Sequence, residues 1–354
     1  MRSVLVDKVA SVAQHSNLSH ELRLSADIPC EEGVLIAVRV LNNKTRYNQL
    51  ELTSGRMATV NQGDIIVGAL GHRKALLGYS GHLPEELAVG TTVQILNIGG
   101  VLGICDSANP DVGAPFDCEV LGTVLHFPYL GERIGVPARV GATEFDENAG
   151  LDTRGIPVIA LAGTCMDSGK TAAACSIVSR LRHRGLKVAA CKATGVSLRR
   201  DILAMEDAGA SDSMIFSDLG VVTTTSANGP ALTCALLSSL AELKPDVIVI
   251  ELGDGLLGAY GVEAILADDN IRDAFSVVIL CANDPVAAWG GARILREQFN
   301  IDPAVVTGPA TDNAVGVDQI NERLSLPAIN ALSNGVALGD MIADLVDASG
   351  SPNS

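Results

Sequence analysis

Aromatic residues are scarce in this chain and make up only 3% of its 354 residues. Because 47% of the residues are nevertheless hydrophobic, the core must be built mainly from Val, Ile, Leu and Ala. Such a core is typical of parallel sheets covered by helices, whose strands read as continuous apolar runs. The chain is long for one hydrophobic core, so we expect two domains.

Positively charged residues are also few: the chain has 25 Lys and Arg and 41 Asp and Glu. Its formal net charge is −16. This balance argues against a nucleic-acid partner. No apolar stretch reaches transmembrane length uninterrupted, and the N-terminus lacks a signal-peptide core, so we expect a cytoplasmic protein with no membrane partner. The eight cysteines show no CxxC pair and no Cys/His ligand spacing, which favours reduced thiols over disulfides or zinc.

The first part of the chain, residues 1–150, reads as a β-rich domain. Short apolar runs at 34–40, 65–70, 92–98 and 120–125 are separated by closely spaced turn signals. This spacing is typical of a small barrel or a sandwich, and the pattern does not choose between them. The polar, glycine-bearing segment 144–155 is the best candidate for a linker.

The pattern of predicted secondary structure changes at residue 156, and the new pattern continues to about residue 348. Strand-like runs alternate with helical stretches, which predicts an α/β domain with a doubly wound, mostly parallel sheet and right-handed crossovers. The predicted strands are 158–161, 187–191, 247–250, 277–280 and 304–307, and the predicted helices are 172–184, 231–243, 287–298 and 338–346. Ligands of such sheets bind at the carboxyl ends of the strands.

The most informative motif joins the first of these strands to the first helix. It is a glycine-bearing loop that ends in Gly-Lys-Thr, an arrangement that points backbone N–H groups and a helix N-terminus at phosphate. The strict pattern would need a glycine at Thr164, so this loop is one residue longer than the ordinary form. The predicted nucleotide-binding residues of the loop are Gly163, Thr164, Cys165, Met166, Asp167, Ser168, Gly169, Lys170 and Thr171. We expect Lys170 to contact the terminal phosphates and the Thr171 hydroxyl to bind Mg²⁺.

Two further strands end in charged residues at the same edge of the predicted sheet. Lys192 ends the second strand and is placed to contact a phosphate or an anionic substrate; a solvated surface lysine is the alternative. Glu251 ends the strand 247–250, where an acidic residue can hold Mg²⁺ or orient a nucleophile. We therefore predict Lys170, Lys192 and Glu251 as catalytic residues, and Thr171, Glu251 and Asp212 as metal ligands. Asp212 is the choice among four aspartates in the segment 199–220.

The base of the nucleotide is expected at a loop after a late strand. The segment 305–316 fits, and Asp312 and Asn313 could read an amino group there, although an Asp-Asn turn without a ligand is an alternative. The GTPase motif Asn-Lys-x-Asp is absent, which favours ATP over GTP.

The loop GTCMDSGKT, the strand ending in Lys-Ala-Thr-Gly (192–195) and the strand ending in Glu-x-Gly-x-Gly (251–255) resemble the dethiobiotin synthetase group of phosphate-loop proteins. The resemblance covers about residues 156–330 and implies ATP, Mg²⁺ and a doubly wound P-loop NTPase sheet. Where that family has Glu-Gly, this chain has Glu251-Leu252. The same half also resembles a family of bacterial two-domain proteins, some of which are amino-acid N-acyltransferases. Neither family accounts for the N-terminal half.

These observations favour an ATP- and Mg²⁺-dependent enzyme, a ligase or kinase, that transfers a phosphoryl group to a small carboxylate or amino metabolite. We also expect a homodimer. Two alternatives stay open at this point: an acyltransferase whose loop holds the phosphates of coenzyme A, and an ATP-driven switch that recruits a protein partner. The switch is the weaker one, because its branch typically carries an extra lysine at the start of the loop, where this chain has Ala162-Gly163-Thr164.

Overall fold

A computed structural model gives the fold and describes residues 1–350 with the exception of 130, 132, 142–145 and 149. The chain forms two compact units, which we call the barrel unit and the sheet unit. The barrel unit comprises Met1–Glu144, Val196–Arg200 and Phe216–Thr223, and the sheet unit comprises Phe145–Gly195, Asp201–Ile215 and Thr224–Ser354. Part of the predicted linker 144–155 lies outside the described residues.

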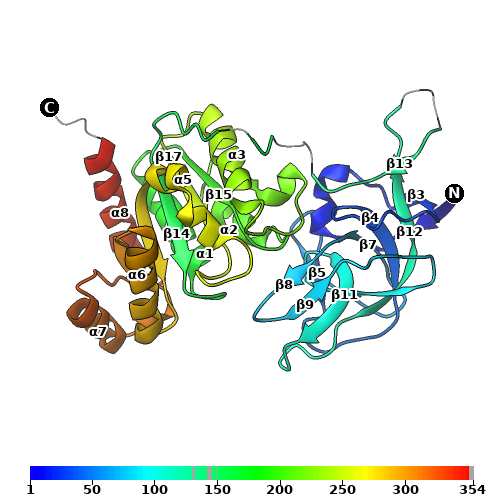
Figure 1. The fold of residues 1–354 in the computed structure, drawn as a ribbon, viewed down its shortest axis with the longest axis horizontal. Coiled ribbons are helices and arrows are strands. Elements are labelled where there is room, and N and C mark those ends of the chain that lie inside the picture. Colours follow the sequence, from blue (N-terminus) through cyan, green and yellow to red (C-terminus); the bar gives the residue numbers. More distant parts are fainter. Residues whose placement is uncertain (130, 132, 142–145, 149, 351–354) are drawn as a thin grey trace. The chain divides into compact units, whose positions relative to one another are not determined.

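Five strands of the barrel unit close into a ring. They are β4 (Leu35–Val40), β7 (Ile65–Leu70), β10 (Thr92–Ile95), β11 (Val101–Ala108) and β12 (Asp117–His126). In this ring β12 pairs with β4, β4 with β7, β7 with β11, β11 with β10, and β10 again with β12. The sequence pattern did not choose between a barrel and a sandwich, and the closed ring of strands shows that this unit is a barrel (Figure 1).

The interior of this ring is apolar, and shorter elements surround it, among them a separate two-stranded sheet of β5 (Gln49–Glu51) and β6 (Met57–Thr59). Most residues of β4 and β7 are buried, and the buried core of the unit includes Val38, Val67 and Val120. The remaining elements of the barrel unit are β1 (Arg2–Leu5), β2 (Lys8–Val9), η1 (Ser11–Ser16), β3 (Glu21–Ser25), β8 (Arg73–Lys74), β9 (Tyr79–His82), β13 (Val136–Pro137) and η2 (Phe216–Leu219).

Two segments of the C-terminal half belong to the barrel unit, which a division into two continuous domains did not anticipate. Val196 and Thr223 form an isolated β-bridge, and the Ser197 amide donates to the Val222 carbonyl at 2.8 Å. The side-chain amide of Asn97 donates to the Ser197 carbonyl at 2.9 Å. The contact between Asn97 and Ser197 joins residues 100 positions apart, so no local pattern in the sequence predicts it.

The described residues of the sheet unit form six parallel strands in the order β16-β15-β17-β14-β18-β19. Four of them have continuous buried runs of β-branched and small residues, as expected for a sheet covered on both faces. The strands are β14 (Val158–Gly163), β15 (Val188–Lys192), β16 (Asp212–Ile215), β17 (Val247–Glu251), β18 (Phe275–Cys281) and β19 (Val305–Thr307).

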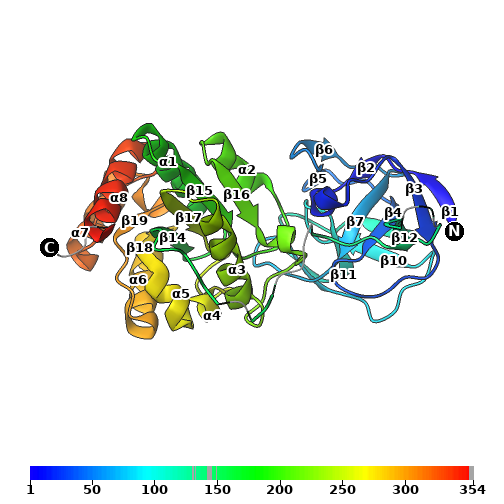
Figure 2. The same ribbon diagram turned by 90° about the horizontal axis from the view of Figure 1, so that it is seen from above.

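Helices cover both faces of this sheet, so the predicted doubly wound α/β class is correct (Figure 2). One face carries α1 (Lys170–His183), α2 (Arg200–Asp207) and α8 (Gly335–Gly350). The other carries α3 (Gly229–Glu242), α4 (Val262–Ala267), α5 (Asp269–Ala274) and α6 (Pro285–Phe299), with α7 (Ala314–Leu324) packed against α6. A short turn of helix, η3 (Pro309–Thr311), follows β19. No helix among the described residues is long and apolar enough to cross a bilayer.

Candidate functional site

The glycine loop, residues 163–171, joins β14 to α1 at the carboxyl edge of the sheet. Its first part is anchored because the Thr164 amide donates to the Cys281 carbonyl of β18 at 2.9 Å. Its last glycine, Gly169, has a left-handed φ of 90° and stands at the N-cap of α1. The loop therefore ends on a helix N-terminus, where free backbone N–H groups and the helix dipole favour an anion. All nine predicted loop residues lie in this one segment.

The side chain of Lys170 folds back over the glycine loop. Its Nζ donates to the Cys165 carbonyl at 2.9 Å, lies 3.4 Å from the Ser168 hydroxyl, and donates to the backbone carbonyl of Asp254. The residue is only 5% exposed. The cation is thus held inside the loop by neutral oxygen atoms, and an incoming phosphate would offer it a charged partner instead.

Thr171 and Glu251 place two oxygen atoms side by side. The Thr171 hydroxyl donates to Oε2 of Glu251 at 3.0 Å. Two neighbouring ligands of an octahedral Mg²⁺ ion with bonds of 2.0–2.1 Å are about 2.9 Å apart, so this pair suits that ion. Among the described residues no group of three or more His, Cys, Asp or Glu could enclose a metal, so Mg²⁺ bound here would rely on water and phosphate oxygens for its other ligands.

Glu251 is almost completely buried, with 2% of its surface exposed. Burial raises the pKa of this carboxyl group, and the neighbouring Lys192 ammonium acts in the opposite direction. A carboxylate in such surroundings is stabilised by any further positive charge, which is the property expected of a metal ligand.

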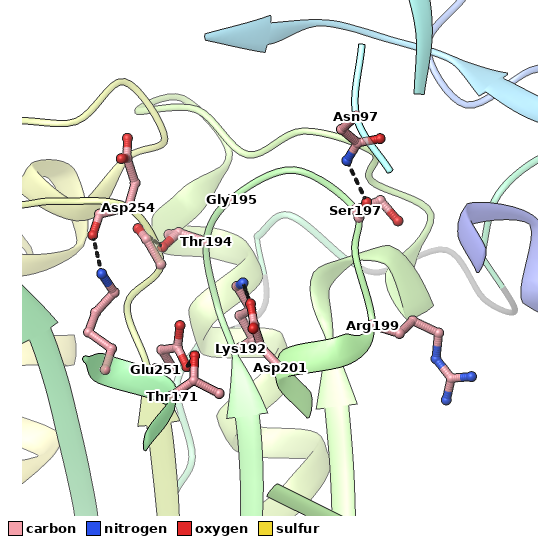
Figure 3. Close-up of polar contacts among 12 residues, drawn as sticks. Asn97, Thr171, Lys192, Thr194, Gly195, Ser197, Arg199, Asp201, Glu251 and Asp254 are labelled. Carbon is pink, nitrogen blue, oxygen red and sulfur yellow. Dashed lines mark hydrogen bonds and ion pairs between the residues drawn. The ribbon is translucent and has the colours of Figure 1, made fainter. Parts of the chain in front are cut away.

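Lys192 is the last residue of β15 and lies beside Glu251 in the strand register. Its ammonium forms an ion pair with the carboxylate of Asp201, in the first turn of α2 (Figure 3). The two side chains are 10% and 14% exposed. Lys192 is therefore not a solvated surface lysine, and the structure brings it to the edge of the sheet that carries the glycine loop.

Asp212 does not lie at this edge, so its prediction as a metal ligand is wrong. It begins β16 and pairs in register with Ala189 near the start of β15, which places it at the amino end of the sheet. There its carboxylate lies 3.1 Å from Nζ of Lys187. The aspartate of the segment 199–220 that reaches the glycine-loop edge is Asp201. Its place in the first turn of the helix after β15 is the signal that could have identified it.

The loop after β19 lies against the glycine loop, as the base-binding prediction requires. A Cβ atom on Gly308 would stand 2.2 Å from the Ser168 carbonyl oxygen. However, Asn313 caps α7 by accepting from the Gly316 amide at 3.3 Å, and Asp312 accepts from the Asn330 side chain at 2.9 Å. Recognition of the base by Asp312 and Asn313 stays a prediction.

Two residues near the glycine loop were missed as site residues. The side-chain amide of Asn283, just after β18, donates to Sγ of Cys165 at 3.1 Å. Asp254, on the loop after β17, holds Lys170 through its backbone carbonyl and directs its carboxylate away from that lysine (Figure 3). The Gly-Asp-Gly sequence at 253–255 is the only local signal for Asp254.

No protein-family model matches this chain. Similar solved structures include chloroplast FtsY from Physcomitrella patens (16% identity, 58% of this chain and 68% of that chain, TM-score 0.37). They also include the hydrogenase maturation factor HypB from Archaeoglobus fulgidus, with 15% identity over 54% of this chain and 91% of that chain and a TM-score of 0.38. A DUF1611-family protein from Anabaena variabilis matches with 14% identity over 59% of this chain and 62% of that chain and a TM-score of 0.40. At such identities and TM-scores none of these similarities carries an argument about function.

The fold class rests on the geometry of the chain itself. A parallel sheet wound on both faces carries a glycine loop between a buried strand and the helix that begins with Lys170 and Thr171. The sheet unit therefore has the fold of a P-loop NTPase, and a smaller β-rich unit precedes it.

Proposed function

We propose that this protein is an ATP- and Mg²⁺-dependent enzyme that transfers the γ-phosphoryl group of ATP to a small carboxylate- or amino-bearing metabolite. The observation that carries the proposal is the convergence of Lys170, the Thr171–Glu251 pair and Lys192 at one edge of the sheet. Phosphoryl transfer needs mainly positioning and charge neutralisation, and these are the groups that supply both.

The residues have distinct roles in this proposal. The glycine loop and the N-terminus of α1 hold the phosphates, and Lys170 neutralises charge on the β- and γ-phosphoryl oxygens. Thr171 and Glu251 would hold Mg²⁺, which when bound draws electron density from the same phosphates. Lys192 directs the acceptor, and Asp201 fixes the direction of the lysine through their ion pair.

The reaction is an in-line displacement. An oxygen atom of the acceptor forms a bond to the γ-phosphorus, the bond from that phosphorus to the β–γ bridging oxygen breaks, and ADP leaves with the electron pair. A carboxylate acceptor would become an acyl phosphate, which an amine can then attack to give an amide. Kinase and ligase chemistry therefore share this first step.

Calorimetry with ATP, ADP, GTP and coenzyme A, with and without Mg²⁺, tests the proposal directly. We expect adenine nucleotides to bind best and Lys170→Ala to lower turnover by about 10²- to 10³-fold, the loss typical of one removed charge contact at a transition state. Lys187→Ala is the matched control, because Lys187 belongs to the same sheet but pairs with Asp212 at the opposite edge.

Two outcomes would redirect the proposal. Tighter binding of coenzyme A than of ATP would indicate acyl transfer. ATP hydrolysis stimulated by a protein partner but by no metabolite would indicate a switch.

A further inference from the structure

Asp254, in the sheet unit, carries a buried carboxylate. The residue is 8% exposed, and neither of its side-chain oxygen atoms has a partner among the described residues. Its backbone has a φ of +72°, in the left-handed region that residues other than glycine seldom adopt. Strain and unsatisfied buried charge together are typical of functional positions.

The structural role of this position does not need the carboxylate. Lys170 is held by the backbone carbonyl of Asp254, which any residue would provide, and a glycine would adopt the left-handed φ more easily. The amide groups of Gly255 and Ala259 lie near the carboxylate and oppose the effect of burial, but neither makes a hydrogen bond of normal geometry to it. The side chain therefore needs another explanation.

The surroundings indicate what the carboxylate lacks. Burial raises the pKa of Asp254, and the charges of Lys170 and Lys192 only partly offset that effect. Removing a carboxylate from water without donors is unfavourable, and a hydrogen-bonding cation is the partner that compensates it best. A hydroxyl group would supply a hydrogen bond but no charge.

We propose that the carboxylate of Asp254 binds the amino group of the second substrate, so that the phosphoryl acceptor is an amine-bearing metabolite. The inference rests on the proposed function, whose substrate class it names. Lys192 ends β15 and Asp254 follows the neighbouring strand β17. A zwitterionic acceptor would present an ammonium group to Asp254 and an anionic oxygen to Lys192.

Gly258 gives the carboxylate its position. A Cβ atom on Gly258 would lie 2.2 Å from Oδ2 of Asp254, so only a glycine there leaves room for the side chain. Gly258→Ala should therefore displace the carboxylate without removing its charge, and it provides a second route to the same test.

The experiment measures ATP hydrolysis stimulated by pairs of small carboxylic acids that differ only in an amino group, such as alanine with propionate and aspartate with succinate. We expect the parent to prefer the amine in kcat/KM by about 10- to 100-fold, the range of one hydrogen bond to a charged group. Asp254→Asn and Gly258→Ala should lose that preference and keep the ATP affinity of the parent. Asp268→Asn, in which the changed carboxylate already accepts two backbone amides, should keep it.

The outcomes separate the inference from the proposed function. If the parent binds no nucleotide, the proposed function fails and the inference fails with it. If the parent binds ATP but no amine stimulates hydrolysis, or if Asp254→Asn keeps the amine preference, the inference alone is wrong.

Thermal unfolding provides a readout that needs no substrate. An unsatisfied buried carboxylate kept for binding costs stability, so Asp254→Asn should leave the Tm of the sheet unit unchanged or raise it by about 1–4 °C. A fall in Tm of similar size would show that the carboxylate organises its loop, and would overturn the inference.

Discussion

The hydroxyl group of Thr171 donates to the buried carboxylate of Glu251 across a distance of 3.0 Å. The two residues are 80 positions apart in the chain and meet because α1 begins at the carboxyl edge where β17 ends. The pair offers two adjacent oxygen ligands to a hard cation.

Replacing Glu251 by Gln should weaken Mg²⁺ binding while the shape of the side chain is kept, because a neutral amide is a poorer ligand for Mg²⁺ than a carboxylate. We expect the Mg²⁺ concentration for half-maximal ATP hydrolysis to rise about 10- to 100-fold, the usual cost of changing a group around a metal. The exposed Glu263→Gln is the matched control. An unchanged metal titration would leave Glu251 as a residue that merely ends its strand.

Replacing Lys192 by Ala should cost turnover far more than it costs ATP affinity. A lysine that directs the acceptor toward the transferring phosphoryl group acts mainly in the transition state. We expect kcat for metabolite-stimulated hydrolysis to fall about 100-fold or more, with the Kd of ATP within a few-fold of the parent. Equal losses in affinity and turnover would instead make Lys192 a residue of the nucleotide site.

Cys165 should be the cysteine most readily alkylated, and bound ATP should protect it. It lies in the glycine loop near the N-terminus of α1, and the Asn283 amide donates to its sulfur atom. Burial raises the pKa of Cys175 to about 11 and that of Cys281 to about 12, which keeps those thiols protonated and slow to react. Mass spectrometry of protein labelled with and without ATP gives the comparison, and labelling of Cys165 that does not respond to ATP would contradict the prediction.

The barrel unit should lose stability in alkaline solution through Tyr79. Burial raises the pKa of this phenol from 10.0 to about 12, so the folded state holds the proton more tightly than the unfolded state. The resulting stability is complete below pH 10 and is lost as the pH rises toward about 12. Thermal unfolding of the parent and of Tyr79→Phe is compared across this range, since phenylalanine has no hydroxyl group to titrate. Parallel curves for the two proteins would contradict the prediction.

Local sequence patterns predicted much of the sheet unit. Five of its six strands were anticipated, because their continuous apolar runs are a local property of the chain. The missing strand, β16 (Asp212–Ile215), has the sequence Asp-Ser-Met-Ile, and its first three residues are only partly buried, so it lacks such a run. The barrel closure could not be read from the sequence, since it depends on the pairing of β10 with both β11 and β12.

Some residues of the candidate site could likewise be predicted from the sequence, and others could not. The glycine loop, Lys192 and Glu251 could be placed because each ends or follows a recognisable strand, and parallel strands bring their carboxyl ends to one edge. The aspartates could not be ranked from the sequence. Asp201 lies in the first turn of α2 and Asp212 begins the strand after that helix, and only the strand register shows that they stand at opposite ends of the sheet.

The sequence by itself determined the strand–loop–helix order, the phosphate-binding chemistry of the loop and the charged strand ends, since these depend on residues close together in the chain. The tertiary structure decided which side chains meet. It pairs Lys192 with Asp201 and places Asp212 at the opposite edge. It also buries the Asp254 carboxylate with no hydrogen-bond partner in the described part of the chain. Strand register and burial set these relationships, and both arise from contacts between segments that are distant in the chain.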